Sequence, residues 1–290
     1  MIWNPQMETI DRQSLEKLQL ERLQNTVKWV YERVPMYRQR LDERNIRPQD
    51  IQSLRDIARL PFTVKDDLRD HYPYGLFAVP MRDVVRIHAS SGTTGRPTVV
   101  GYTREDLDMW SEAMARLIVM AGGCADDIVQ ISFGYGLFTG ALGLHQGWEK
   151  VGASVVPISS GNTERQINLM RDFGVTALVA TPSYAMYMCE VAEKMNALKD
   201  LKLRIGVFGA EGSTEEMRAQ LEKRWGIIAT ENYGLSEIVG PGVAGECTCK
   251  CGMHINEDLF YCEIVDPATG EPLPDGQLGE LGITPLKKQA

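Results

Sequence analysis

The 290-residue sequence lacks several features that would assign a protein to a class at once. It has no run of about eighteen apolar residues, and its N-terminal segment carries neither a basic leader nor an apolar core. We therefore expect no membrane span, no export signal and a cytoplasmic location. A formal net charge of -8 and the absence of any block of like charges argue against a nucleic-acid partner.

Periodic apolar segments are the main feature that is present. With 43% hydrophobic and 24% charged residues, the chain is long enough for one large or two ordinary domains. From Asp127 onward, expected strands alternate with expected helices, which favours an α/β fold with a mostly parallel sheet flanked by helices. The expected strands cover 127–133, 153–159, 177–182, 203–211 and 227–234, and the expected helices cover 137–152, 162–174, 183–198 and 213–226.

The pattern of residues changes twice along the chain, which predicts three structural regions. Residues 1–80 are expected to form a helical region, with two helices within 11–44 separated at Pro35, and these helices are candidate elements of a homodimer interface. Residues 81–240 form the α/β core. Residues 241–290, rich in short strands and turn pairs, form an incomplete β-rich subdomain.

A hydroxyl-rich loop, Ser90–Thr98, follows an apolar run, Val84–Ile87, that predicts a buried strand. Gly92 and Gly95 let the backbone turn its amides toward a ligand, and the hydroxyl groups add donors that suit phosphate oxygens. The common nucleotide loop is excluded, because it needs four residues between its glycines and then Gly-Lys. The alternative is a solvated connection without a ligand.

Two later stretches also carry polar or small residues at the ends of expected strands. The first contains Gly209, Ala210, Glu211 and Gly212. The second contains Tyr233, Gly234, Ser236 and Glu237. Because ligands of α/β sheets bind at the carboxyl ends of the strands, we expect all three loops to converge on one cleft.

Taken in order, "SSGTTGRPT", "FGAEGSTEEMR" and "YGLSEI" resemble the motifs of the adenylate-forming ligases. "PFTVKDDLRDHYPYGLFAVP" and "FGYGLFTGALGLHQG" narrow the resemblance to the phenylacetate-coenzyme A ligases, over essentially the whole chain. The resemblance implies that a carboxylic acid and ATP form an acyl-adenylate with release of pyrophosphate. The acyl group then passes to the thiol of coenzyme A.

The resemblance also implies a role for each matching residue. Ser90, Ser91, Gly92, Thr93, Thr94 and Gly95 would hold the β- and γ-phosphates of ATP. Glu237 would hold Mg²⁺, and Glu237 and Thr94 would be the catalytic residues. Ala210, Glu211 and Gly212 would border the adenine, Tyr233 would pack against it, and Gly234 and Ser236 would complete the nucleotide site. Without the resemblance, Glu237 would be read as a helix-start glutamate and Tyr233 as a core residue.

The expected pocket for the acid is lined by aromatic and small residues. A flat aryl ring needs apolar walls and neighbours that leave room for it. The residues that match or neighbour such a pocket are Tyr135, Phe138, Gly140, Ile238, Gly240 and Pro241. Alternatively, Tyr135 and Phe138 are packing residues.

Four possible zinc ligands, Cys247, Cys249, Cys251 and His254, fall within one short stretch. In a reducing compartment, such crowding favours a metal over disulfides. Some members of the family resemble this chain at Cys247 and His254 but complete the site with a later Cys-x-Cys pair, which is absent here. Two interpretations therefore remain. Either Cys249 or Cys251 completes a Zn²⁺ site, or the cysteines are free thiols in a surface loop.

Beyond "GELGITPL", the family continues with a ribose-binding aspartate and a small mobile domain that carries a lysine. This sequence stops before both, so we expect it to be the large N-terminal part of a ligase. Two functions remain open from the sequence: the core of an aryl acid-coenzyme A ligase, or a non-catalytic nucleotide-binding remnant that could hold zinc.

Overall fold

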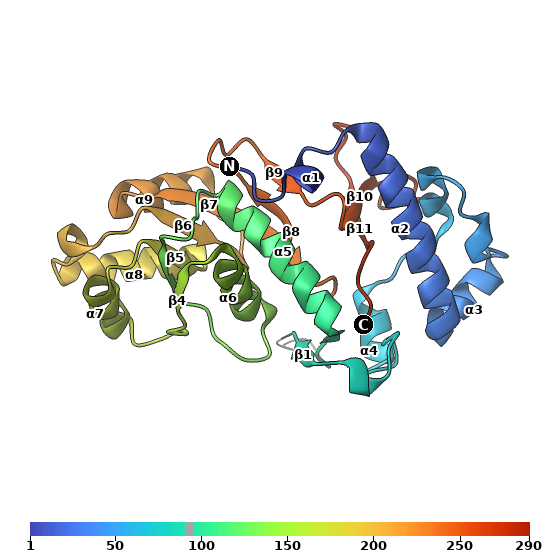
Figure 1. Cartoon of the computed structure of the whole chain (residues 1–290), viewed down its shortest axis with the longest axis horizontal. Coiled ribbons are helices and arrows are strands. Elements are labelled where there is room, and N and C mark those ends of the chain that lie inside the picture. The colour runs from blue at the N-terminus through green and yellow to red at the C-terminus, as the bar shows by residue number, and fades with distance from the viewer. Residues whose placement is uncertain (91–95) are drawn as a thin grey trace. The chain divides into compact units, whose positions relative to one another are not determined.

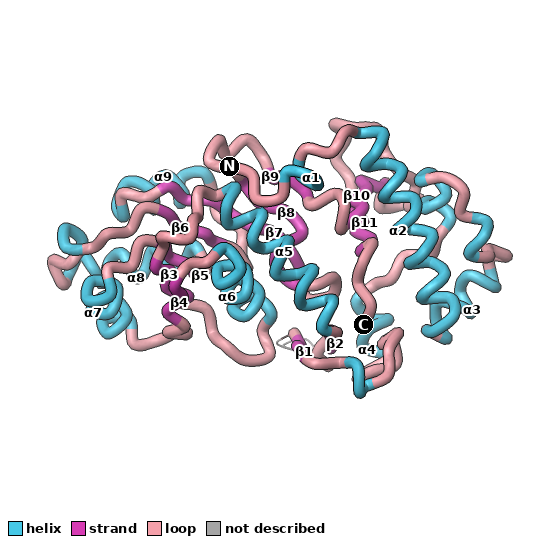
Figure 2. The backbone as a smooth tube through the Cα atoms, viewed as in Figure 1, coloured by secondary structure: helices cyan, strands magenta, loops and turns pink. Residues whose placement is uncertain are grey.

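The computed structural model describes residues 1–90 and 96–290 (Figures 1 and 2). The chain divides into two compact units. The first contains Met1–Asn4 and Trp110–Ile255, and the second contains Pro5–Met109 and Asn256–Ala290. The limits expected from the sequence at residues 80 and 240 stay a prediction. Helix α5 (Arg104–Met120) supplies residues to both units.

A seven-stranded sheet, ordered β4-β3-β5-β6-β7-β8-β9, forms the first unit. Strands β3 to β7 are parallel, and β8 and β9 are antiparallel additions. The strands are β3 (Ile128–Ile131), β4 (Ser154–Val156), β5 (Ala177–Ala180), β6 (Ile205–Phe208), β7 (Ile228–Leu235), β8 (Gly240–Glu246) and β9 (Met253–Ile255). The helices of this unit are α6 (Thr139–Val151), α7 (Thr163–Phe173), α8 (Pro182–Lys194) and α9 (Glu215–Trp225), with η4 (Leu198–Asp200). The expected α/β fold is confirmed.

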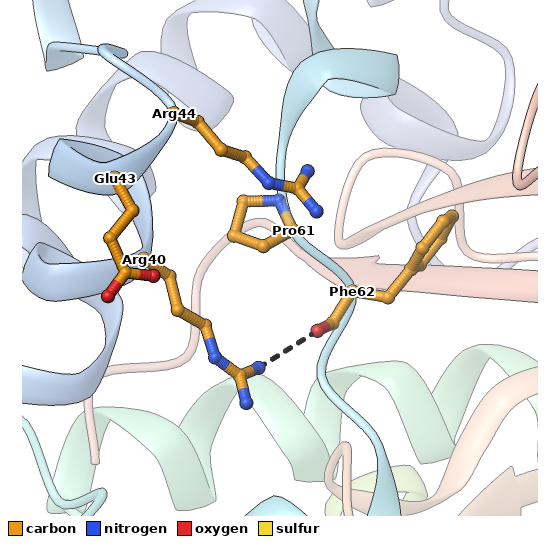
Figure 3. Close-up of a pocket in the computed structure, with 5 residues that line it drawn as sticks. All are labelled: Arg40, Glu43, Arg44, Pro61 and Phe62. Carbon is orange, nitrogen blue, oxygen red and sulfur yellow. Dashed lines mark hydrogen bonds between the residues drawn. The ribbon is translucent and has the colours of Figure 1, made fainter.

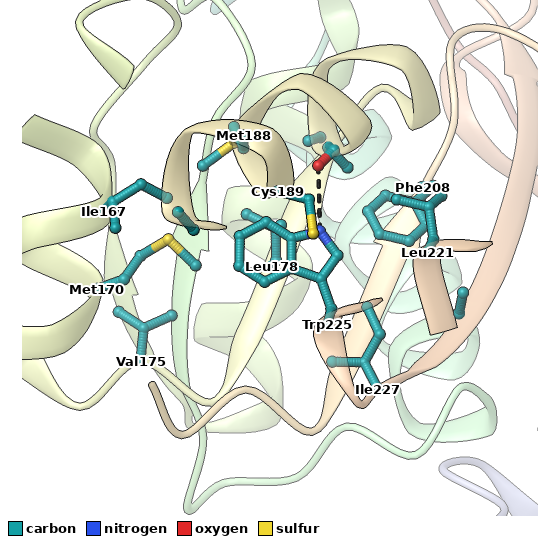
Figure 4. Close-up of a cluster of buried hydrophobic side chains, with 14 of the residues drawn as sticks. Ile167, Met170, Val175, Leu178, Met188, Cys189, Phe208, Leu221, Trp225 and Ile227 are labelled. Atoms are coloured by element: carbon teal, nitrogen blue, oxygen red, sulfur yellow. Dashed lines mark hydrogen bonds between the residues drawn. The ribbon is translucent and has the colours of Figure 1, made fainter. Parts of the chain in front are cut away.

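Helices α7, α8 and α9 cover one face of this sheet through an apolar cluster (Figure 4). Met170 from α7, Met188 from α8 and Trp225 from α9 pack there with Leu178 and Phe208 from the strands. The Trp225 indole also donates to the carbonyl oxygen of Ala185 at 3.1 Å, so its one polar atom is satisfied inside the core. This packing holds the parallel strands, and therefore the loops that follow them, in place.

Helix boundaries in the first unit follow local capping chemistry. Asn162 begins α7 by accepting from the backbone nitrogen of Arg165, and Gly174 ends it with a φ of 65°. Thr214 begins α9 through the backbone nitrogen of Met217, and Gly226 ends it with a φ of 71°. Left-handed glycines at helix ends avoid the steric cost of a side chain, which is why these boundaries could be predicted.

The second unit contains helices and two small antiparallel sheets. Its helices are α1 (Pro5–Glu8), α2 (Arg12–Arg33), α3 (Pro35–Glu43) and α4 (Lys65–Asp70), with η1 (Pro48–Asp50), η2 (Leu54–Arg59) and η3 (Met81–Asp83). Its sheets pair β1 (Arg86–Ala89) with β2 (Val99–Tyr102), and β10 (Phe260–Val265) with β11 (Glu280–Pro285). The helix break expected at Pro35 is confirmed, and a β-rich C-terminal segment is present.

The strand expected at Val84–Ile87 lies two residues later than predicted. Helix η3 ends at Asp83, Val84 is its C-cap residue and Val85 is 47% exposed, so the buried strand β1 spans Arg86–Ala89. The apolar run correctly predicted a strand. Its first residues, however, belong to the end of the preceding turn.

No helix within the described ranges is both long and apolar enough to cross a membrane.

Candidate functional site

Loops that follow strands β3, β5, β6 and β7 meet at one edge of the first unit's sheet, since these strands are parallel. The loop after β6 begins at Gly209, where a side chain would collide with Asn232. A Cβ at Gly209 would lie 2.9 Å from Asn232 Nδ2, which itself donates to the carbonyl oxygen of Phe208 at 2.7 Å. Only glycine permits this approach of β6 to β7.

The predicted adenine-bordering residues continue this loop. Ala210 has a φ of 70°, a backbone angle that few residues other than glycine adopt. The Glu211 carboxylate accepts a hydrogen bond of 2.6 Å from the backbone nitrogen of Ser183, in the first turn of α8. A carboxylate is favourable there because the first backbone N–H groups of a helix lack intrahelical partners. The loop is therefore tied to a helix start as well as to β7.

A tight hairpin between β7 and β8 carries the next group of predicted residues. The backbone nitrogens of Ile238 and Val239 donate to the carbonyl oxygen of Leu235 at 3.1 and 3.2 Å, which places Glu237 in the turn. Glu237 is thus not a helix-start residue. Gly234 is required here, because a Cβ would lie 2.0 Å from the carbonyl oxygen of Gly240.

Tyr233 lies on β7 just before this turn and is 39% exposed. That exposure separates it from the core residues of the unit and leaves its ring available to a flat ligand.

Trp110 holds the second half of the hairpin, a role that the sequence did not reveal. Its indole nitrogen donates to the carbonyl oxygen of Pro241 at 2.6 Å. Gly240, with a φ of 108°, packs so closely that a Cβ would lie 2.6 Å from the Trp110 ring, and Gly143 in α6 packs on the same ring. In the sequence, Trp110 reads as an ordinary core residue, since its partner is 131 positions away.

The hairpin also contacts the start of α6, where the remaining acid-pocket candidates lie. The hydroxyl groups of Thr139 and Ser236 are 3.3 Å apart. Phe138 is 41% exposed and meets Phe133 edge-on, with 5.8 Å between ring centroids. Gly140 leaves room for the Phe138 ring, which would lie 2.4 Å from a Cβ there. The structure thus brings the segment around 138–140 beside the hairpin that carries Ile238, Gly240 and Pro241, which the sequence also assigned to the acid pocket.

Tyr135 belongs to a chain of polar side chains that runs along α6. Its hydroxyl group is 3.0 Å from His145 Nδ1, and His145 Nε2 is 3.0 Å from the Glu149 carboxylate. Burial, followed by the charge of Glu149, raises the pKa of the Tyr135 hydroxyl above its usual range. Burial is therefore the main reason that Tyr135 stays a neutral phenol, and the His145–Glu149 pair beside it is one that the sequence did not indicate.

The hydroxyl-rich loop lies in the second unit. Strand β1 precedes it and strand β2 follows it, and these two strands form an antiparallel sheet of their own, so it does not follow a strand of the parallel sheet. At its base, the Ser90 backbone nitrogen donates to the carbonyl oxygen of Thr98, and the Thr98 nitrogen donates to Ser90 Oγ, both at 3.0 Å. Ser91, Gly92, Thr93, Thr94 and Gly95 lie outside the described residues. Convergence of this loop with the other two stays a prediction.

The thiol loop, Cys247–Gly252, connects β8 to β9. Cys249 and Cys251 are exposed, and the cysteines are free. No three His, Cys, Asp or Glu side chains of residues 1–90 and 96–290 are arranged to hold a metal ion, so the predicted zinc site has no structural support. A hydrogen bond between the Cys247 side chain and His254, and another from the backbone at Cys249, lower the pKa of the Cys247 thiol to about 7.

A pocket of about 240 Å³ lies in the second unit and contains none of the predicted site residues (Figure 3). It is lined by Arg40, Glu43, Arg44, Pro61 and Phe62. Arg40 donates to the carbonyl oxygen of Phe62 at 3.1 Å and to Asp67 Oδ2 at 2.9 Å. Because Arg40 is occupied in this way, the pocket does not offer its charge to a ligand.

The chain is similar to known proteins over nearly its whole length. The model of the family described as "AMP-binding enzyme" matches residues 6–284. The phenylacetate-coenzyme A ligase of Pseudomonas putida is 54% identical over 286 residues, which are 98% of this chain and 65% of that protein. That of Escherichia coli (strain K12) is 50% identical over 296 residues, covering 100% of this chain and 68% of that protein.

A crystal structure of 2-hydroxyisobutyryl-CoA ligase in complex with 2-HIB-AMP and CoA is also similar. It superimposes with a TM-score of 0.94 at 28% identity, over 100% of this chain and 63% of that one. The chain thus spans 65% to 68% of the length of the two curated relatives.

Proposed function

Because the chain belongs to the AMP-binding enzyme family, we propose that it provides the nucleotide and acid sites of an ATP-dependent ligase. The substrate would be phenylacetate or a related aryl acid, joined to coenzyme A through an acyl-adenylate. The observation that carries this proposal is the meeting of the loop after β6, the β7–β8 hairpin and the start of α6 at one sheet edge.

In this proposal, the residues of the edge divide into two groups. Ala210, Glu211, Gly212 and Tyr233 border and stack on the adenine, and the exposure of Tyr233 supports this role. Phe138, Gly140, Ile238, Gly240 and Pro241 surround the aryl ring, with Tyr135 as a neutral polar wall. Holding both reactants in fixed positions supplies much of the rate of such a transfer.

Ser90 and residues 91–95 would hold the β- and γ-phosphates through backbone amides and hydroxyl groups. The Glu237 carboxylate, presented by a hairpin turn, is of the hard oxygen type that Mg²⁺ prefers. When bound, this ion would neutralise phosphate charge as the carboxylate attacks. A cytoplasmic location and a homodimer stay predictions.

Titration of ATP into the chain in the presence of Mg²⁺, followed by phenylacetate, tests the proposal. We expect the Glu237→Gln variant to bind Mg-ATP about tenfold to a hundredfold more weakly, because an interaction with a charged group is worth roughly 1.5–3 kcal/mol. Its melting temperature should match that of the wild type. Equal affinities in the two proteins, or no difference between Mg²⁺ and EDTA, would rule out the role of Glu237.

Release of pyrophosphate then separates the ligase from a nucleotide-binding remnant. A ligase releases pyrophosphate only when an acceptable acid is present, and we expect phenylacetate to be accepted in preference to acetate. Binding of ATP without any acid-dependent pyrophosphate release would favour the remnant.

A further inference from the structure

A buried cluster of one arginine and two glutamates joins α9, β7 and β8 in the first unit. The side chains of Arg218, Glu231 and Glu246 are only 13%, 14% and 6% exposed. Arg218 Nη1 is 2.8 Å from Glu246 Oε1, and Arg218 Nη2 is 4.0 Å from Glu231 Oε1. Buried charges are costly unless they are paired and hydrogen-bonded, so the three side chains depend on one another.

The cluster reaches the nucleotide segment through Ser213. The Ser213 hydroxyl group donates to Glu231 Oε1, the same oxygen that faces Arg218. Glu246 Oε2 in turn accepts from the backbone nitrogen of Glu231 at 2.9 Å. Ser213 directly follows Ala210–Gly212, and Glu231 lies two residues before Tyr233. One guanidinium therefore connects the loop after β6 to both strands of the hairpin.

The geometry of Arg218 differs from that of an ion pair built for stability alone. Its Nε atom is buried and has no hydrogen-bond partner within the described part of the chain. Two carboxylates also share this single cation, so loss of the arginine would leave both of them buried without it.

Arg224 on the same helix provides the contrast. It binds the Glu193 carboxylate with two hydrogen bonds, from Nε at 2.9 Å and from Nη2 at 2.7 Å. This pair joins α9 to α8 and involves no residue of the loop after β6. It is also more exposed, at 24% for Arg224 and 42% for Glu193.

We propose that Arg218 is a positioning residue for the nucleotide site. Arg218 holds Glu231, and through it Ser213, so that Ala210–Gly212 and Tyr233 keep the arrangement that receives a nucleobase. This role rests on the proposed function of the sheet edge. Arg218 itself need not contact the nucleotide.

The test compares Arg218→Met with Arg224→Met, using Arg218→Lys as the conservative variant. We expect Arg218→Met to raise the Kd for ATP about tenfold while the Kd for phenylacetate changes less than about twofold. Arg218→Lys should recover only part of the ATP affinity, since lysine keeps the charge but loses the planar fork. Arg224→Met should leave the ATP affinity unchanged. Equal losses for ATP and phenylacetate in Arg218→Met would show a general structural role and overturn the proposal.

Ser213→Ala keeps the test decisive if Arg218→Met does not fold. This variant removes the link between the loop and Glu231 but leaves the buried ion cluster intact. We expect an ATP Kd about three- to fivefold above wild type, with a melting temperature lowered by a few degrees because the buried Glu231 carboxylate loses one donor. A wild-type ATP Kd in Ser213→Ala would overturn the proposal.

Hydrogen exchange separates this inference from the proposed function. We expect amides of residues 209–214 to exchange faster in Arg218→Met than in Arg224→Met, whether or not ATP binds. Equal exchange in the two variants overturns the positioning role. If the wild-type chain binds no ATP, the proposed function and the nucleotide role of the cluster are overturned. A difference in exchange between the two variants would then still show that Arg218 holds the loop.

Discussion

The β7–β8 and β8–β9 hairpins are consecutive and share β8, yet their surroundings differ. At the turn of the first, Trp110 and Thr139 press against Gly240. At the second, a Cβ on Gly252 would meet nothing within 4 Å, and Met253 and Ile255 are exposed. Both hairpins contain side chains capable of chemistry. The thiol loop is joined to α9 by the Lys250–Glu222 ion pair, but Cys249 and Cys251 stay exposed, whereas distant residues lie directly against the first turn. Such direct packing separates a built site from a local concentration of reactive groups.

The largest expected effect comes from placing the same side chain in each hairpin. Gly240 and Gly252 have φ angles of 108° and 98°, so alanine strains the backbone at both. At Gly240 it also overlaps Trp110, and we expect Gly240→Ala to lower the free energy of unfolding by about 2–5 kcal/mol. Gly252→Ala should cost about 1–2 kcal/mol, from strain alone. Urea denaturation measures both, and equal losses would mean that Trp110 readily moves aside.

A smaller effect is expected at the start of α8. Glu211→Ala removes the acceptor of the Ser183 backbone N–H, so we expect a loss of about 0.5–1 kcal/mol together with weaker ATP binding. Glu164→Ala, in the first turn of α7, is the matched control, since Glu164 makes no side-chain hydrogen bond to any described residue. If both variants bind ATP as the wild type does, Glu211 serves only the helix.

Local signals were sufficient for the elements of the first unit. Gly174 and Gly226 mark helix ends, and the regular alternation of apolar segments gave the parallel strands. These features depend on neighbours in the sequence, and so they could be predicted. The Val84–Ile87 strand was placed two residues too early because an apolar run alone does not show where a preceding turn ends.

The support of the candidate site could not be predicted from the same signals. Trp110 contacts Pro241, and Arg218 contacts Glu246, across long stretches of sequence. A buried tryptophan and an arginine in an amphipathic helix look ordinary until the fold brings their partners to them. The direction of the strand before the hydroxyl-rich loop could not be predicted for a related reason, since it depends on the pairing of β1 with β2.

Ala210→Gly should change stability very little. Alanine at a φ of 70° is strained by roughly 1 kcal/mol, but glycine loses a similar amount through the entropy of the unfolded chain. We expect a net change within about 0.5 kcal/mol, with faster hydrogen exchange at residues 209–212. Lys250→Gly in the thiol loop, at a φ of 54°, provides the comparison, and we expect it to lose stability because it also removes the ion pair with Glu222. A gain in stability above about 1 kcal/mol at Ala210 would mean that the loop is strained more than its backbone angle indicates.

The smallest effect on stability is expected at Cys247, where the test concerns reactivity. The hydrogen bond with His254 and the backbone at Cys249 lower the thiol pKa to about 7, whereas burial raises the pKa of Cys262 to about 11. Because the thiolate is the reactive form, alkylation of Cys247 by iodoacetamide should reach half its maximal rate near pH 7. Cys262 should react little below about pH 9. In His254→Ala the midpoint for Cys247 should rise toward the ordinary thiol value of 9.0, because the lowered pKa depends first on that partner. Peptide-level mass spectrometry follows each cysteine separately. An unchanged midpoint for Cys247 in His254→Ala would show that His254 does not lower the pKa of this thiol. The thiol loop would then lack even this local contact, in contrast to the β7–β8 hairpin.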